Sequence, residues 1–205
     1  ILYRSDKLEL LDAEFCTYPE KITGFEGSFN DVKSKSWNLG VFRMKSGGNV
    51  FIFATTHLWW KRSPLENDTS PSRNCQRGSD EAREQQIASL IKKIEEYREK
   101  YSCPAILVGD MNCSYGSKAM QFVRDYGFRH AHDIASEYAE EAIGYHYCFA
   151  DGYKTQYYDK PFEFAIDHIY IKGESEGSVK RFERHSPEYY YAVSDHSPAY
   201  IDMEI

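Results

Sequence analysis

The order of strand-like and helix-like patterns constrains the fold of this chain more than any other feature of its sequence. Short apolar segments with the composition of strands occupy residues 8–15, 38–44, 49–56, 105–109, 164–172, 179–185 and 199–203. The sequence KSGG at 45–48 joins the second segment to the third and predicts a hairpin. Strands outnumber helices, and the helices lie between strands. We therefore expect an α/β fold of two sheets with helices outside.

Two segments carry a helical pattern. Ser79 is expected to cap a helix that Cys103-Pro104 ends. Its apolar residues recur with the helical period at Ile87, Leu90, Ile91, Ile94 and Tyr97. A second helix is predicted over residues 118–126, with Ser117 as its cap and Gly127 as its stop. No internal repeat or linker interrupts this order, so residues 1–205 are expected to form one domain.

Composition narrows the class of function. Of the 205 residues, 41% are hydrophobic and 28% are charged, as in an ordinary globular protein. The net charge of −7 argues against tight, sequence-blind attachment to nucleic acid. No apolar run approaches the roughly 18 residues of a membrane span. The cysteines are odd in number and contain no C-x-x-C pair, which fits neither a disulfide framework nor a zinc ribbon and leaves the redox compartment open.

Polar residues stand where one of the most apolar segments ends. The sequence ILVGDMN at 106–112 passes directly from branched apolar side chains to Asp110 and Asn112. In a strand these two side chains share one face, and Met111 points back to the interior. A carboxylate beside a carboxamide suits a divalent cation, a water nucleophile or a phosphoryl oxygen. The same pair also starts turns and caps helices, so both interpretations stay open.

Three other apolar segments carry acids or imidazoles at or beside a strand end. His57 follows residues 50–56, and Asp167 comes after residues 164–166. Asp195 and His196 stand directly before the last predicted strand. Each has an ordinary structural explanation when taken singly. Because buried strands seldom accumulate unpaired ionisable groups, their coincidence predicts a functional site where these ends converge.

Together these segments resemble a known family. THL at 56–58, GDMN at 109–112, IDHI at 166–169 and SDHSP at 194–198 follow the order used by the endonuclease/exonuclease/phosphatase superfamily. The resemblance implies the four-layer α-β-β-α sandwich of deoxyribonuclease-I-like proteins, and hydrolysis of a phosphodiester or phosphomonoester. It also implies Mg²⁺ or Mn²⁺ as cofactor. Independently, carboxylate and carboxamide oxygens favour such hard cations over zinc.

The resemblance assigns each polar residue a role. His57 would stabilise or protonate phosphate oxygens, and Asp110 would orient or deprotonate the attacking water. Asn112 would hold the nucleophile and the transition state. Asp167 would position His196, which would contact the scissile phosphate or act as the general base.

The metal would lie near Asp195, Asp110 and Asn112. The family also uses an asparagine on its first strand and a glutamate after its first helix, and neither motif occurs here. We therefore expect that the chain, which opens at Ile1, lacks the first strand-helix unit of about 30 residues. On its own it is expected to hold metal weakly, to turn over slowly and to associate through exposed sheet edges.

The segment after His57 is predicted to contact substrate. An aromatic ring there could stack on a base, a sugar or an acyl chain, and arginines could receive a second phosphate. The predicted contacts are Trp59, Arg62, Arg73 and Arg77. Packing of the tryptophans under the loop is the alternative. The aromatic-rich segment at 145–164 is a second candidate loop. The substrate itself stays open between nucleic acid, a sugar or inositol phosphate, and a lipid headgroup.

Two other functions compete with a phosphoesterase. A member of the same fold could bind a phosphate ligand without turnover, although all six polar residues of the strand ends are present. A zinc hydrolase ranks lowest, since no H-E-x-x-H motif or His/Cys cluster occurs.

Overall fold

A computed structural model gives the structure of the chain and describes residues 1–64, 73–138, 165–173, 177–184, 194, 196 and 198–205. Its strands are β1 (Leu8–Thr17), β2 (Ser36–Met44), β3 (Val50–His57), β4 (Ala105–Asp110), β5 (Arg129–His130), β6 (Glu137–Tyr138), β7 (Asp167–Lys172), β8 (Val179–Arg184) and β9 (Ala199–Met203). Its α-helices are α1 (Ser79–Tyr101), α2 (Lys118–Asp125) and α3 (Ala131–Ile134), and a short 3-10 helix, η1, spans Asp31–Lys33.

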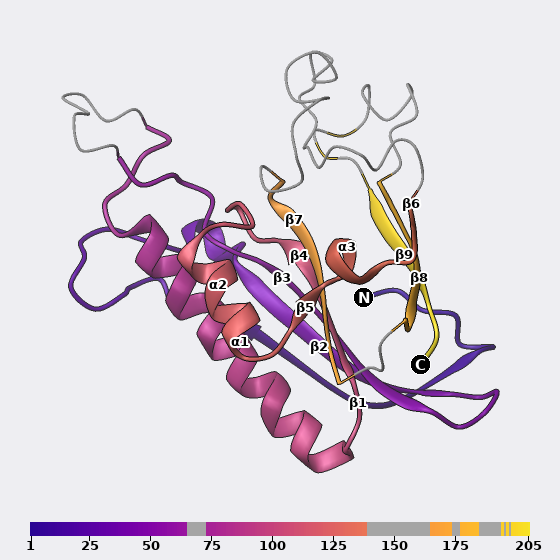
Figure 1. Cartoon of the computed structure of the whole chain (residues 1–205). Coiled ribbons are helices and arrows are strands. Elements are labelled where there is room, and N and C mark those ends of the chain that lie inside the picture. The colour runs from indigo at the N-terminus through magenta and orange to yellow at the C-terminus, as the bar shows by residue number, and fades with distance from the viewer. Residues whose placement is uncertain (65–72, 139–164, 174–176, 185–193, 195, 197) are drawn as a thin grey trace.

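The strands form two sheets (Figure 1). The larger has six strands in the order β1-β2-β3-β4-β7-β5, and the smaller has three in the order β6-β8-β9. β1, β2 and β3 pair antiparallel, as the hairpin signal predicts. β3 and β4 pair parallel, with the long helix α1 as their crossover, and β7 pairs antiparallel with β4. The predicted α/β class is confirmed.

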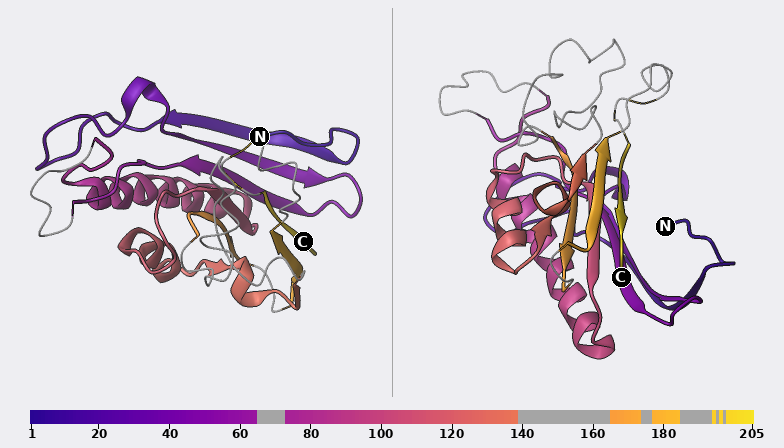
Figure 2. Two further views of the ribbon diagram at one scale, coloured as in Figure 1. Left: turned by 90° about the horizontal axis from the view of Figure 1, so that it is seen from above. Right: turned by 45° about the vertical axis from the view of Figure 1, so that its right-hand side comes forward.

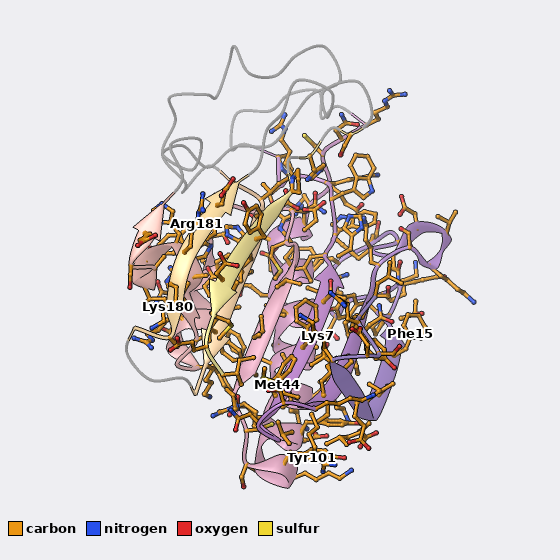
Figure 3. The ribbon with its side chains drawn as sticks, turned by 90° about the vertical axis from the view of Figure 1, so that its right-hand side faces the viewer. Lys7, Phe15, Met44, Tyr101, Lys180 and Arg181 are labelled. Carbon is orange, nitrogen blue, oxygen red and sulfur yellow. The ribbon has the colours of Figure 1, made fainter. Side chains whose placement is uncertain are left out.

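The large sheet lies between a helical layer and the small sheet. α1 and α2 cover one of its faces, and β8 and β9 stand over the other (Figures 1 and 2). Of the four predicted layers, the described residues form three. Figure 3 looks from the side of the small sheet, with Arg181 of β8 and the exposed Phe15 of the edge strand β1 at opposite sides of the view.

Alternation along the central strands builds a separate core on each face of the large sheet. On β3, Ile52 and Ala54 pack in the cluster that contains the helix residues, whereas Phe51 packs between the sheets. On β4, Leu107 belongs to the helix-side core and Ile106 to the inter-sheet core. Successive side chains of a strand point to opposite faces, so these strands are buried on both sides.

Most predicted elements have their expected bounds within a few residues, and the differences have local causes. The first helix is capped by the left-handed Gly78 rather than by Ser79, whose hydroxyl instead donates to the Gln76 carbonyl. β7 begins at Asp167, not at residue 164. β5, α3 and β6 were not predicted, because each is too short to carry a periodic pattern. The aromatic segment at 145–164 lies outside the described residues.

Two buried histidines connect β5, β7 and the loop after β4. His168 Nε2 lies 2.9 Å from the Cys113 carbonyl oxygen, and His130 Nε2 lies 3.2 Å from His168 Nδ1. His130 Nδ1 accepts the backbone N–H of His132 at 3.2 Å. With both rings neutral, His168 donates to Cys113 and His130 donates to His168, so these partners assign both tautomers. Burial lowers the pKa of His130 well below its usual value.

The free energy of unfolding should therefore decrease as the pH is lowered, and part of this decrease should depend on His130. Below a pKa of about 6.5, the His130 ring binds a proton in the unfolded chain but stays neutral in the folded chain, so acid favours unfolding. We expect this proton to lower the free energy of unfolding by up to about 1.4 kcal/mol per pH unit below pH 6.5. Urea unfolding of the wild type and of His130→Asn, from pH 7.5 to pH 5, measures the slope.

Asparagine keeps an acceptor at the helix cap but does not titrate, so the slope should be shallower in His130→Asn. His132→Asn is the matched control, because His132 lies two residues away on the same helical turn and is only partly buried. Equal slopes in the wild type and His130→Asn would contradict the assignment.

Candidate active site

Three of the predicted polar residues form a row across the middle of the large sheet. His57 at the end of β3 is in register with Asp110 at the end of β4. Asp110 is in turn in register with Asp167 at the start of β7. Residues directly opposite one another on neighbouring strands project to the same face. Strand pairing alone therefore brings together side chains that lie about 50 residues apart in the sequence.

The row lies on the face that packs against the small sheet. Val108 precedes Asp110 by two positions, Ile169 follows Asp167 by two, and both pack in the inter-sheet core. The alternation that fills this core thus also directs the polar row toward the second sheet. A cavity of about 710 Å³ extends along this face from Asp110 and Asp167. Asp110 and Asp167 of the row form the polar end of a cavity whose other walls are largely apolar.

His196, from the segment before β9, completes the cluster. Its Nδ1 lies 2.6 Å from Asp167 Oδ2, and its Nε2 lies 3.9 Å from Asp110 Oδ2. The same Asp110 oxygen lies 3.4 Å from His57 Nε2. One atom each from Asp110, Asp167 and His196 lie within 4.8 Å of one another. The structure thus brings four of the predicted residues together around one carboxylate oxygen.

The environment of the row shifts the proton affinities of its members. Burial, with the carboxylate of Asp167 as the next cause, raises the pKa of Asp110 to about 6. Burial, followed by the ammonium of Lys35, lowers the pKa of His57 to about 4. A carboxyl group whose pKa is raised beside a second carboxylate is typical of sites that exchange protons or bind cations.

The turn after β4 explains both the glycine and the asparagine of GDMN. A Cβ on Gly109 would lie 2.0 Å from the Thr56 carbonyl oxygen, so only glycine permits the close approach of β3 and β4. Asn112 has a left-handed backbone with φ of 50° and donates its N–H to Asp110 Oδ1 at 2.9 Å. Its side-chain Nδ2 donates to the Leu58 carbonyl at 3.0 Å. The turn interpretation of this pair is confirmed, and Asp110 is fixed by it.

Two buried side chains of α1 hold the segment that follows His57. Gln86 accepts the N–H of Trp59 at 2.8 Å. Arg83 donates to the carbonyl of Trp59 at 3.0 Å and to that of Lys61 at 2.7 Å, and it pairs with Asp80. The helix therefore fixes the direction in which the chain leaves β3. Neither residue was predicted, since both look like polar surface positions of an amphipathic helix.

Lys35 is the other residue of the site that sequence analysis missed. Its side chain is buried, and its Nζ lies 2.6 Å from His57 Nε2. Burial lowers the pKa of Lys35, and the carboxylates of Asp110 and Asp31 oppose that shift. A lysine between two serines at the start of a strand has no pattern that distinguishes it from a surface residue.

The predicted substrate contacts occupy different environments. Trp59 is 1% exposed and packs with Ile22, Phe29 and Ala82, so the packing alternative describes it. Trp60 is 37% exposed, and its indole donates to Asp31 Oδ2 at 3.2 Å. The three arginines, Arg62, Arg73 and Arg77, are exposed. In the described part of the chain, no hydrogen bond or ion pair joins Arg73 or Arg77 to the row. The predicted metal residue Asp195 lies outside the described residues.

Comparison with protein families decides the classification. The model of the endonuclease/exonuclease/phosphatase family matches residues 18–196, most of the chain and all four polar strand ends. The chain belongs to this family. No curated protein matches its sequence significantly.

Several solved structures share the fold of this chain. An endonuclease/exonuclease/phosphatase from Bacteroides vulgatus is 22% identical with a TM-score of 0.68, over 99% of this chain and 68% of the other. A mannosyl-6-phosphatase from Bacteroides thetaiotaomicron is 19% identical with a TM-score of 0.66, over 99% and 69%. A conserved protein of unknown function from Enterococcus faecalis is 19% identical with a TM-score of 0.65, over 98% and 69%. The predicted deoxyribonuclease-I-like fold is confirmed.

The residues of this family member fit part of a divalent-cation site. Burial and, after it, the nearby carboxylate of Asp167 raise the pKa of Asp110, and a cation between the two carboxylates would relieve their repulsion. Asp110 Oδ1 accepts the Asn112 N–H, and Asp167 Oδ2 is bonded to His196. Mg²⁺ takes about six oxygen ligands, often with several waters. The two carboxylates would therefore supply a minority of the ligands.

The hydrogen bonds from Arg83 of α1 to the segment after His57 lead to a prediction about stability. Replacing Arg83 by methionine keeps a long apolar side chain but leaves the buried carbonyl of Trp59 and the partly buried carbonyl of Lys61 without their donor. We expect the free energy of unfolding to fall by about 2 kcal/mol, in line with the cost of unsatisfied buried groups. Urea unfolding at pH 7.5 measures the change.

Arg77→Met removes an exposed arginine from the same region and is the matched control, with an expected change within about 0.5 kcal/mol. Equal effects of the two substitutions would show that the bonds of Arg83 contribute nothing to stability.

Proposed function

We propose that this family member is a Mg²⁺- or Mn²⁺-dependent phosphoesterase in which an activated water attacks phosphorus, and that residues 1–205 act as one domain. The observation that carries the proposal is the position of Asp110 Oδ2, which lies 3.4 Å from His57 Nε2 and 3.9 Å from His196 Nε2. His196 is bonded in turn to Asp167. Carboxylate and imidazole side chains directed at one point are suited to orienting and deprotonating water.

Asp167 sets the proton of His196. A carboxylate 2.6 Å from Nδ1 accepts the ring N–H there, so Nε2 is the acceptor of the neutral ring. That acceptor faces Asp110 Oδ2, which is a second acceptor when Asp110 is ionised. A water that donates to both has its lone pairs directed away from them, toward an ester in the cavity. Asp110 and His196 would thus orient the nucleophile, and one of them would take its proton.

The remaining predicted residues support that arrangement. Asn112 would act chiefly through the turn that fixes Asp110, because its Nδ2 already bonds Leu58. Asp110 and Asp167 would hold the divalent cation, and Asp195 stays a predicted third ligand. When bound, the cation would supply charge neutralisation at the phosphoryl oxygens.

We propose the substrate only as a chemical class, a phosphate ester. Trp60 offers the exposed ring that was predicted for Trp59, and Arg62, Arg73 and Arg77 offer cations farther along the loop. A sugar phosphate is supported by the mannosyl-6-phosphatase with the same fold. Inositol phosphates, single-stranded nucleic acid and lipid headgroups present the same phosphate. No helix in the described part of the chain has the length and apolarity to cross a membrane.

The alternative is a phosphate-binding module without turnover. Binding would then persist without hydrolysis, which separates the two functions in one experiment.

We expect slow Mg²⁺-dependent hydrolysis of p-nitrophenyl phosphate or bis(p-nitrophenyl) phosphate by the 205-residue chain, abolished by a chelator. Asp110→Asn should lower the rate by about a hundredfold to ten-thousandfold, because it removes a proton acceptor from the reacting water. Absorbance at long incubation times measures both rates, and Mn²⁺ replaces Mg²⁺ in a parallel series.

Asp125→Asn is the matched control, because Asp125 is an exposed carboxylate at the end of α2. Loss of activity in Asp110→Asn alone supports the proposal. Turnover that is unchanged in Asp110→Asn, or that is indifferent to the chelator, would overturn it. Binding of phosphate without turnover would establish the module instead.

Mn²⁺ should broaden NMR signals of the row before those of other histidines. If Asp110 and Asp167 hold the cation, the ring signals of His196 and His57 lose intensity at substoichiometric Mn²⁺. His132, which belongs to α3 and not to the row, serves as the internal control. Uniform broadening of all histidine signals would contradict a cation site at the row.

A further inference from the structure

Lys35 is a buried ammonium that faces the row. The residue directly precedes β2 and is 4% exposed. Its Nζ lies 2.6 Å from His57 Nε2, so its long side chain reaches the end of β3 rather than the solvent. Lysine is seldom fully buried unless it is paired, so such a position calls for a specific partner.

The backbone of Lys35 is held by a second buried polar residue. Asn30 is 1% exposed, and its Oδ1 accepts the Lys35 N–H at 2.7 Å. Its Nδ2 donates to the Lys35 carbonyl at 2.9 Å and to the Tyr18 carbonyl at 2.6 Å. The Tyr18 hydroxyl bonds Thr56 Oγ1 at 2.8 Å, beside His57. Lys35 is therefore fixed relative to the end of β3 by side chains that are themselves buried.

The ammonium has more donors than its surroundings use. It carries three N–H groups. Considering only the residues that the structure describes, His57 Nε2 is its one hydrogen-bond acceptor. The carboxylates of Asp110 and Asp31 attract it but do not approach to ion-pair distance within that part of the chain. Two donors are thus left for a ligand at the edge of the row, and a buried cation with unused donors favours an anion.

The contact with Lys35 also decides what His57 can do. Lysine has no acceptor, so Nε2 of His57 accepts and the ring proton lies on Nδ1. A ring whose Nε2 lone pair receives an ammonium N–H is neutral. The positive charge at this end of the row therefore belongs to Lys35, and His57 positions that charge.

We propose that Lys35 binds a non-bridging phosphate oxygen of the ester, with His57 as the neutral residue that orients it. The inference rests on the proposed phosphoesterase site, since it names the side chain that receives the phosphate there. It changes the role implied for His57, which would no longer be the cation that contacts phosphate. The ligand it predicts is any phosphate group small enough to reach the row.

The test uses inorganic phosphate as the probe, without divalent cations, so that binding is measured apart from turnover. The intact 205-residue chain is compared with Lys35→Met and with Lys33→Met by NMR titration. Methionine keeps the length of the side chain and removes its charge. Lys33 is the matched control, because it is an exposed lysine of η1 two residues away.

We expect Lys35→Met to weaken phosphate binding by about tenfold to a hundredfold, the equivalent of one lost charge-assisted hydrogen bond. Lys33→Met should bind within about twofold of the wild type, because an exposed charge contributes little. Equal binding by the wild type and by Lys35→Met would overturn the proposal.

Two measurements on the wild type keep the proposal testable if Lys35→Met does not fold. Phosphate should shift the Nζ resonance of Lys35 and leave that of Lys33 in place. The ¹⁵N spectrum of His57 should show the Nδ1–H form, because the ammonium of Lys35 occupies the Nε2 lone pair. An unshifted Lys35 resonance, or a His57 ring with its proton on Nε2, would overturn the proposal.

The role of Lys35 and the phosphoesterase activity can be tested independently of each other. Turnover that survives in Lys35→Met at the rate of the wild type would remove Lys35 from the site and leave the phosphoesterase intact. Lys35-dependent phosphate binding without any turnover would remove the phosphoesterase and leave the anion site intact.

Discussion

The register between β3, β4 and β7 is the constraint on which the rest of the site depends. It places His57, Asp110 and Asp167 side by side on one face of the large sheet. A shift of one residue in either pairing would turn a polar side chain into the helix-side core and an apolar one into the cavity. That register is fixed by burial on both faces and by Gly109, which permits β4 to approach the Thr56 carbonyl. The precision of the site is therefore a consequence of core packing several residues away from it.

Much of this arrangement could be predicted from the sequence, because it follows from local patterns of apolar and polar residues. Apolar segments predicted β2, β3 and β9, helical periodicity predicted α1, and a cap and a stop residue predicted α2. The polar residues His57, Asp110, Asp167 and His196 were found because they interrupt apolar segments at their ends, where an ionisable group needs an explanation. The structure brings these four together. Their order also led to the family, whose model matches the same segments.

What could not be predicted depends on contacts between distant segments. Lys35 and Arg83 look like surface residues in the sequence, and only tertiary packing buries them against His57 and against the carbonyl of Trp59. The difference between Trp59 and Trp60 is of the same kind. They are identical neighbours in the sequence, yet one packs on Phe29 and the other reaches Asp31 at the surface. The short elements β5 and α3 could not be predicted for a further reason, because segments of two to four residues are too short to show a periodic pattern.

The charges of the row show why a buried lysine belongs there. A phosphate ester is an anion, and Asp110 and Asp167 would repel it from the point where water is to attack. Burial reduces the repulsion in part, by raising the pKa of Asp110 toward neutrality. A divalent cation would reduce it further, but the two carboxylates supply only a minority of the ligands such a cation takes. Lys35 places a fixed positive charge at the opposite end of the row from Asp167, with His57 between it and Asp110. On the proposed mechanism, the row would then run from a cation suited to phosphate, through the carboxylate that would orient water, to the aspartate bonded to His196. Such an arrangement of charges would orient an anionic ester although the net charge of the chain is −7, because within a low-dielectric cleft the nearest charges dominate.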